Sequence, residues 1–185
     1  MRTLHALAAL PIAATLALIA LPAEASARPA CPAPSKAELK RTEPDRPARG
    51  TKAIKGVRVG HLPKGFTYGE VVANRHHGMT EYGYLWADDR DDVDRAHRSL
   101  WVRVACRPGV TKLAQLKKVP FQEGRFTDTT TLKVGSREVL TRDGDGALGH
   151  GRYAGWVERD GVVVTVMASE PLVPELVKII KSIRL

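Results

Sequence analysis

The sequence is poor in aromatic residues and cysteine, and it lacks the common catalytic motifs. Phe, Trp and Tyr make up 5% of the 185 residues. Because single-stranded nucleic acid stacks on aromatic side chains, we expect no nucleic-acid partner. No C-x-x-C, H-E-x-x-H or G-x-S-x-G pattern occurs. Redox, zinc-protease and serine-hydrolase signatures are therefore missing, and we expect no cofactor.

Long apolar runs are absent from the sequence except at its start. Leu4–Leu21 is largely apolar, Arg2 precedes it, and the small residues Ala25–Ala27 follow it. This order predicts a secretory signal peptide over residues 1–27, cleaved near Ala27. An uncleaved membrane anchor is the alternative, and Pro11 and the small-residue stop disfavour it. The sequence thus predicts a secreted or extracytoplasmic protein.

The two cysteines, Cys31 and Cys106, both follow the predicted cleavage site. An even number of cysteines in an exported chain is typical of disulfide bonding, so we expect one bridge between them. Lipidation of Cys31 is the competing interpretation. Ala30 suits the position before a lipidated cysteine, but Arg28 stands where a leucine would be expected.

The charge balance is strongly basic, at +9 overall. Residues 28–56 contain five prolines and eight basic residues against three acidic ones, with few apolar side chains. This composition predicts a Pro-rich basic linker, followed by a single domain over 57–185. The excess of positive charge favours an anionic partner, either a polymer of the cell envelope or an acidic membrane surface.

The pattern of the domain predicts an α+β fold: a largely antiparallel sheet covered by one short and one C-terminal amphipathic helix. A short helix is expected at 111–119 and a longer one at 171–185, where apolar residues recur on one face. That face either covers the sheet or contacts a membrane surface. Alternating residues and turn signals predict the strands 57–62, 66–75, 81–87, 100–106, 132–134, 138–141, 153–158 and 162–168.

One group of residues is a weak candidate metal site. Imidazole and carboxylate groups are zinc ligands, and they occur near each other in the sequence at His76, His97, Asp89 and Asp91. The spacing matches no calcium-loop or zinc motif, so solvent-exposed histidines and an acidic loop at 88–94 are the ordinary interpretation.

Two further patterns have possible roles in binding. Tyr82, Tyr84 and Trp86 alternate along one strand, so they share a face that either lines a binding surface or belongs to the core. The sequence Gly144–Gly149 matches G-x-G-x-x-G. It is followed by a loop and a strand rather than a helix, so we interpret it as a loop and not as a dinucleotide site.

Four short motifs resemble a family of unknown function. They are Leu62–Phe66, Gly135–Leu140, Gly155–Gly161 and Pro171–Ile183. The family is the extracytoplasmic domain of bacterial anti-sigma-factor-like and sporulation-associated membrane proteins, and the resemblance covers about residues 57–185. It implies an antiparallel sheet with helices, in the style of periplasmic lipoprotein-carrier folds, and a sensing or binding role.

Two hypotheses about function follow. The first is an exported, non-catalytic binding or interaction module of the cell envelope, whose ligand is anionic. The second is a secreted hydrolase whose catalytic residues are dispersed along the sequence.

Overall fold

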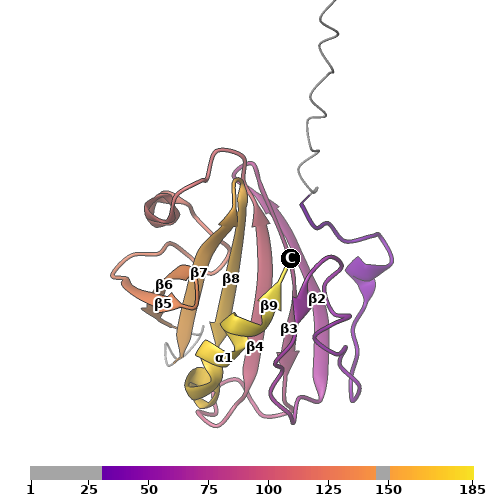
Figure 1. The fold of residues 1–185 in the computed structure, drawn as a ribbon. Coiled ribbons are helices and arrows are strands. Elements are labelled where there is room, and N and C mark those ends of the chain that lie inside the picture. The colour runs from indigo at the N-terminus through magenta and orange to yellow at the C-terminus, as the bar shows by residue number, and fades with distance from the viewer. Residues whose placement is uncertain (1–30, 145–150) are drawn as a thin grey trace, which may run out of the picture.

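The computed structural model describes residues 31–144 and 151–185, so the predicted signal peptide and most of the Gly144–Gly149 motif lie outside the described residues. The helices and strands follow one another along the chain (Figure 1) in this order: η1 Glu38–Lys40, β1 Arg58–Val59, β2 Tyr68–His76, β3 Met79–Ala87, β4 Ser99–Cys106, η2 Leu113–Lys118, β5 Thr130–Val134, β6 Arg137–Asp143, β7 Arg152–Arg159, β8 Val162–Ala168, η3 Glu170–Glu175, α1 Leu176–Ser182 and β9 Ile183–Arg184. The η elements are 3-10 helices.

Seven strands form one antiparallel sheet in the order β2-β3-β4-β8-β7-β6-β5. The α+β class predicted from the sequence is confirmed. Strands β4 and β8 pair in the centre although the segment carrying η2, β5, β6 and β7 separates them in sequence. Among the described residues, no helix is long and apolar enough to cross a membrane.

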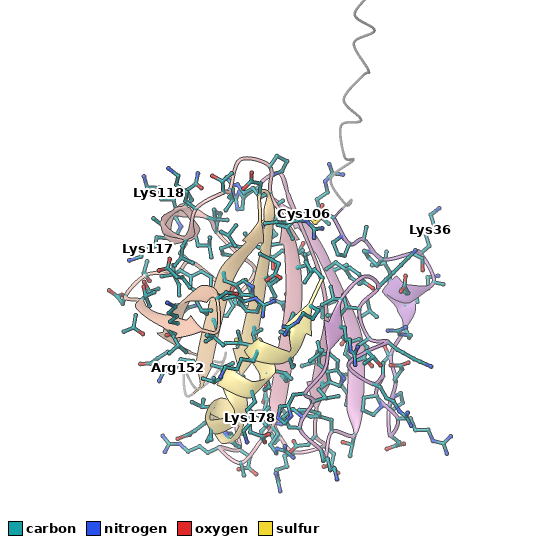
Figure 2. The ribbon with its side chains drawn as sticks, viewed as in Figure 1. Lys36, Cys106, Lys117, Lys118, Arg152 and Lys178 are labelled. Atoms are coloured by element: carbon teal, nitrogen blue, oxygen red, sulfur yellow. A yellow bond between two sulfur atoms is a disulfide. The ribbon has the colours of Figure 1, made fainter. Side chains whose placement is uncertain are left out.

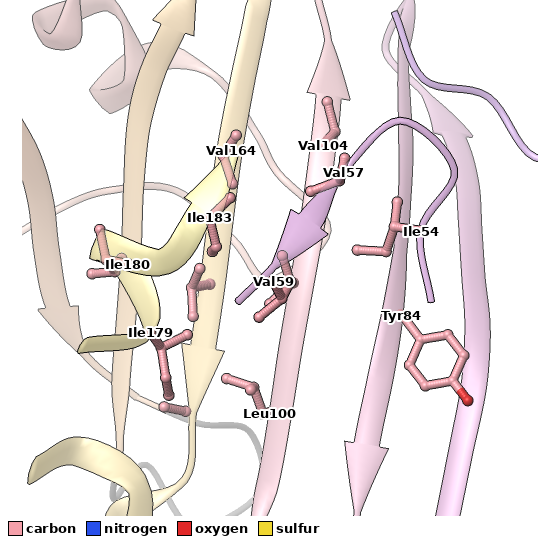
Figure 3. Packing of buried hydrophobic residues seen from close by; sticks show 14 of the residues in the cluster. Ile54, Val57, Val59, Tyr84, Leu100, Val104, Val164, Ile179, Ile180 and Ile183 are labelled. Carbon is pink, nitrogen blue, oxygen red and sulfur yellow. The ribbon is translucent and has the colours of Figure 1, made fainter. Parts of the chain in front are cut away.

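The C-terminal segment covers one face of this sheet. Its last strand, β9, pairs with β1 in a separate two-stranded ribbon. Val59 and Ile183, which are paired in the ribbon, are both buried and lie over the apolar residues of β4 and β8 (Figure 3). Ile179 and Ile180 of α1 are also fully buried in this cluster. The apolar face of the terminal segment therefore covers the sheet.

The other face of the sheet is covered by the segment between β4 and β5. Phe126 lies directly against Gly155, which leaves no room there for a Cβ atom. The Phe126 ring stacks on Tyr153, with 4.5 Å between ring centroids. A glycine in the middle of β7 is therefore required by the close approach of an aromatic ring.

The prediction of a linker over residues 28–56 is wrong for the part that the structure describes. Residues 31–56 run along the sheet (Figure 1), and Ala53 and Ile54 are buried in the core. We call residues 41–56 the strap. The amide of Val71 donates to the carbonyl of Arg41, and Glu43 and Gly69 exchange two backbone hydrogen bonds. The strap thereby covers the edge of β2, so backbone pairing compensates for its lack of apolar side chains.

The two helix predictions need correction in their type and length. The segment at 113–118 is a 3-10 helix. The terminal helix predicted over 171–185 consists of the 3-10 helix η3, the seven-residue helix α1 and the strand β9. Pro174 lies within η3, where its missing N–H prevents a regular α-helical ladder. Ile183 and Arg184 leave the helix to pair with β1.

Candidate functional site

The aromatic residues proposed as a binding face belong to the core instead. Tyr82, Tyr84 and Trp86 are each fully buried. Their polar atoms are bonded to the N-terminal part of the same chain: Tyr82 Oη accepts from the amide of Lys55, and Trp86 Nε1 donates to the carbonyl of Ala48. Of the two interpretations of this face, the structure shows the core, because the strap occupies it.

The metal-site prediction is also wrong for the four residues named. His76 ends β2 and pairs with the first residue of β3, whereas His97 follows the far end of β3. Nine strand residues span about 27 Å, so the two imidazoles lie at opposite ends of the sheet. His97 Nδ1 lies 3.0 Å from Asp88 Oδ1. In the described ranges, no group of three or more His, Cys, Asp or Glu side chains is arranged to hold a metal ion.

The other two members of that set belong to the loop between β3 and β4. Asp89 is exposed to solvent. Asp91 Oδ1 accepts a hydrogen bond from the amide of Val93, so this carboxylate stabilises a local turn. The interpretation of an exposed acidic loop agrees with residues 89–94, whereas Asp88 is buried and pairs with Arg90.

The predicted disulfide is present between Cys31 and Cys106. Cys106 is the last residue of β4, in the centre of the sheet. The bridge therefore fixes the start of the described N-terminal segment to one end of the sheet, from which the chain continues toward the strap.

A basic cleft of about 1050 Å³ opens in the described part of the protein. It lies where the β5–β6 turn and the β7–β8 turn meet η2 and the C-terminal segment. Both turns contain a glycine with positive φ, Gly135 at 65° and Gly161 at 75°, which permits tight reversals. Basic side chains come from β5, β6, β7 and the C-terminal segment, at Lys133, Arg137, Arg159, Lys181 and Arg184.

The Arg137 side chain lines the cleft and is held in place by hydrogen bonds. Its guanidinium donates two hydrogen bonds to the carboxylate of Glu158, of 2.8 and 2.9 Å. It also donates to the carbonyl oxygens of Ile180, near the end of α1, and of Ile183, the first residue of β9. Because its donors are used in this way, Arg137 joins the C-terminal segment to the sheet and does not offer a free charge.

Glu158 is held in its ionised form. Burial alone would raise its pKa, but the hydrogen bonds from Arg137 and Trp156 outweigh burial and lower the pKa below 4.5. The Trp156 indole donates to Glu158 Oε2 at 2.6 Å, and the Arg137 guanidinium lies over the same indole ring. The carboxylate is thus committed to this structural network.

Two lysines supply the free positive charge. Lys133 and Lys181 are exposed on the cleft and form no ion pair with any residue that the structure describes. Glu138 and Asp160 are the remaining acidic residues on the lining, so basic groups outnumber acidic ones. A concave surface with excess charge of one sign concentrates ligands of the opposite sign.

A smaller cavity of about 340 Å³ lies on the opposite face of the sheet, between β2, β3, β4 and the segment at 122–123. Two buried charged residues line it, Glu81 and Arg103. Glu81 Oε1 accepts from the amide of Gln122 and lies 2.8 Å from His76 Nε2. Arg103 pairs with Glu123 and lies over Trp101.

The composition of the two cavities bears on catalysis. Among the described residues that line the basic cleft, Ser136 and Thr111 have hydroxyl groups but no His or Cys is present. The smaller cavity has carboxylates but no Ser, Thr or Cys on its lining. Neither cavity combines a nucleophile with an imidazole base, the arrangement typical of hydrolases that act through a covalent intermediate.

Sequence reasoning missed both cavities. The cleft residues extend from position 111 to position 184, and the only sequence signal was basic residues in predicted turns. Arg103 and Glu81 gave a clearer signal, since each is a charged residue at a position in an otherwise apolar strand. The chain matches no protein-family model, no curated protein and no solved structure at a significant level.

Proposed function

We propose that this protein is an exported, non-catalytic binding module of the cell envelope that holds an anionic ligand in the basic cleft. Export follows from the signal-peptide pattern at residues 1–27. The observation that supports the ligand class is the convergence of five basic side chains on one hollow, of which Lys133 and Lys181 form no ion pair in the described ranges.

A polymer is a better ligand than a membrane surface. Peripheral membrane binding combines basic residues with apolar side chains that enter the lipid. In the described residues the exposed large apolar side chains are scattered, at Leu39 in η1, Val93 in the β3–β4 loop and Val177 in α1. A concave basic site without such a patch suits a chain of phosphate or carboxylate groups.

A secreted hydrolase is the competing function. It is less well supported, because neither cavity brings a nucleophilic hydroxyl or thiol together with an imidazole. The family resemblance of residues 57–185 agrees with a sensing or binding role, and it rests on the short motifs alone.

The test is a charge reversal within the cleft. Lys133→Glu/Lys181→Glu should weaken binding of long-chain inorganic polyphosphate by about tenfold or more, because like charges then face the ligand. The matched control is Lys36→Glu/Lys64→Glu, which makes the same change in net charge at exposed lysines outside the cleft lining. Figure 2 shows Lys36 at the right edge of the molecule, away from Lys178 of α1 at the bottom.

The control distinguishes binding at the cleft from attraction of the ligand by the net charge of the protein. If the two double variants lose affinity equally, net charge alone explains binding and the cleft is not the site. If wild-type protein binds no polyphosphate and no poly-glutamate at low salt, the proposed function is wrong. Isothermal titration at several salt concentrations measures both the affinity and its electrostatic component.

A further inference from the structure

The basic cleft has a neighbour with which it shares a residue. A second hollow of about 590 Å³ lies between the strap, β1 and the end of the chain. Arg184 lines both hollows. The second hollow has three further basic residues, Lys52, Lys55 and Arg58, and one acidic side chain, Glu38. The two hollows are therefore linked by a cation.

Arg184 has a basic residue as its direct partner in the ribbon. In the register of β1 and β9, Arg58 lies opposite Arg184, while the next pair, Val59 and Ile183, is buried. Successive side chains of a strand point to opposite faces, so both arginines are on the solvent face of the ribbon. Like charges directly opposite each other across an antiparallel pair destabilise it.

No ion pair in the described ranges neutralises this repulsion, although the charge of Arg184 also acts on Glu158. Arg184 donates to the carbonyl oxygens of Lys181 and Ile183, and Arg58 forms no ion pair with any residue in the described ranges. Glu38, the acid of the second hollow, accepts hydrogen bonds from the amide of Ser35 and from Tyr82 Oη. An anion lying between Arg58 and Arg184 would neutralise both.

We infer that the ligand is a linear polyanion, which runs from the basic cleft across the Arg184–Arg58 pair into the second hollow. This inference rests on the proposed function and extends it. A small anion would fill one hollow only, whereas a polymer with repeated phosphate or carboxylate groups contacts both. Each added contact along one chain is intramolecular, so affinity rises with chain length.

Chain length is the variable that tests the inference. The affinity of wild-type protein, expressed per phosphate group, should be about tenfold or more higher for long-chain polyphosphate than for triphosphate. Arg58→Glu/Lys55→Glu should abolish this gain with long chains and leave triphosphate affinity unchanged, because neither residue lines the basic cleft. Lys36→Glu/Lys64→Glu is again the control of equal charge.

Arg58→Glu alone provides a second measurement that does not depend on the ligand. It replaces a repulsive cross-strand pair by an attractive one, so the melting temperature without ligand should rise. A variant that melts higher and yet loses the chain-length gain separates a binding role from a structural role. A lower melting temperature would show that Arg58 stabilises the ribbon and would overturn its assignment to the ligand.

The outcomes distinguish this inference from the proposed function. If triphosphate and long chains bind equally per phosphate and Arg58→Glu/Lys55→Glu has no effect, the cleft binds an anion but the extended path is wrong. If neither probe binds, the proposed function fails. Binding to phosphatidylglycerol vesicles without binding to polyphosphate or poly-glutamate would overturn the assignment of a polymeric ligand. It would indicate that the ligand is a membrane surface.

Discussion

The indole nitrogen of Trp86 donates a hydrogen bond of 2.7 Å to the carbonyl oxygen of Ala48. This contact joins β3, the strand next to the edge of the sheet, to the strap. Beside it, the hydroxyl of Tyr84 accepts from the amide of Ala48 at 2.9 Å and donates to the carboxylate of Glu43. The strap is therefore attached through polar atoms of buried aromatic residues.

The Tyr84 hydroxyl should stabilise the protein appreciably. We expect Tyr84→Phe to lower the free energy of unfolding by about 1.5 to 3 kcal/mol, the range for a hydrogen bond to a charged group. Tyr68→Phe is the matched control, because Tyr68 also donates to a carboxylate, that of Glu70, but is partly exposed. Its cost should stay below about 1 kcal/mol. Urea denaturation measures both, and equal costs would contradict a role for the buried bond.

The same tyrosine predicts sensitivity to alkaline pH. Burial, together with the hydrogen bond to Glu43, raises the pKa of Tyr84 above its ordinary value of 10.0. A raised folded-state pKa gives stability that is fully present below pH 10 and is lost as pH rises beyond it. The unfolding free energy of wild type should therefore fall above pH 10, and that of Tyr84→Phe should fall less steeply. Parallel slopes for the two proteins would contradict this assignment.

The disulfide between Cys31 and Cys106 should contribute strongly to stability. The cysteines are 75 residues apart in sequence, and chain-entropy arithmetic for a loop of that length gives about 4 kcal/mol. We expect reductant to lower the melting temperature of wild type and to leave Cys31→Ala/Cys106→Ala unchanged. Alkylation of wild type without reductant, detected by intact mass, would show that the bridge does not form in solution.

The sequence was a good guide to the sheet because the signals there are local. Strands β7 and β8 flank Asp160-Gly161, and Gly161 has the positive φ that this turn requires. The apolar face of the terminal segment was also found correctly. Ile183 is buried as predicted, although it lies in the strand β9 and not in the predicted helix. Either element would place its side chain against the core.

The strap and the cleft depend on contacts that composition does not reveal. The strap has many prolines and charges, which is typical of a linker, yet it pairs with β2 and caps the polar atoms of Tyr84 and Trp86. The cleft is formed by residues that are distant in sequence. Lys133 and Lys181 face the same hollow only because β5 and α1 are neighbours in the fold.

The ion pair between Arg137 and Glu158 predicts a loss of stability in acid. The pKa of Glu158 is lowered in the folded state, so its contribution is present above pH 4.5 and is lost as pH falls through the folded pKa. Glu158→Gln should cost about 2 kcal/mol at pH 7 and should weaken the dependence on pH below 4.5. Glu138→Gln, an exposed neighbour on the cleft, is the control. A pH dependence unchanged in Glu158→Gln would contradict the assignment.

The burial of α1 gives the prediction that separates packing from membrane contact. Ile179 is fully buried against the sheet, whereas Val177, two residues earlier in the same helix, is 39% exposed. Ile179→Ala should lower the free energy of unfolding by about 2 to 5 kcal/mol, since it removes buried methyl groups and leaves a cavity. Val177→Ala should cost less than about 1 kcal/mol, because its side chain is already partly in water. Both are β-branched residues replaced by alanine in one helix, so the gain in helix propensity is similar and cancels in the comparison.

Lipid-free denaturation midpoints provide the measurement. If Ile179→Ala unfolds at the wild-type midpoint, α1 does not stabilise the sheet, and its apolar face would have to serve a surface outside the protein.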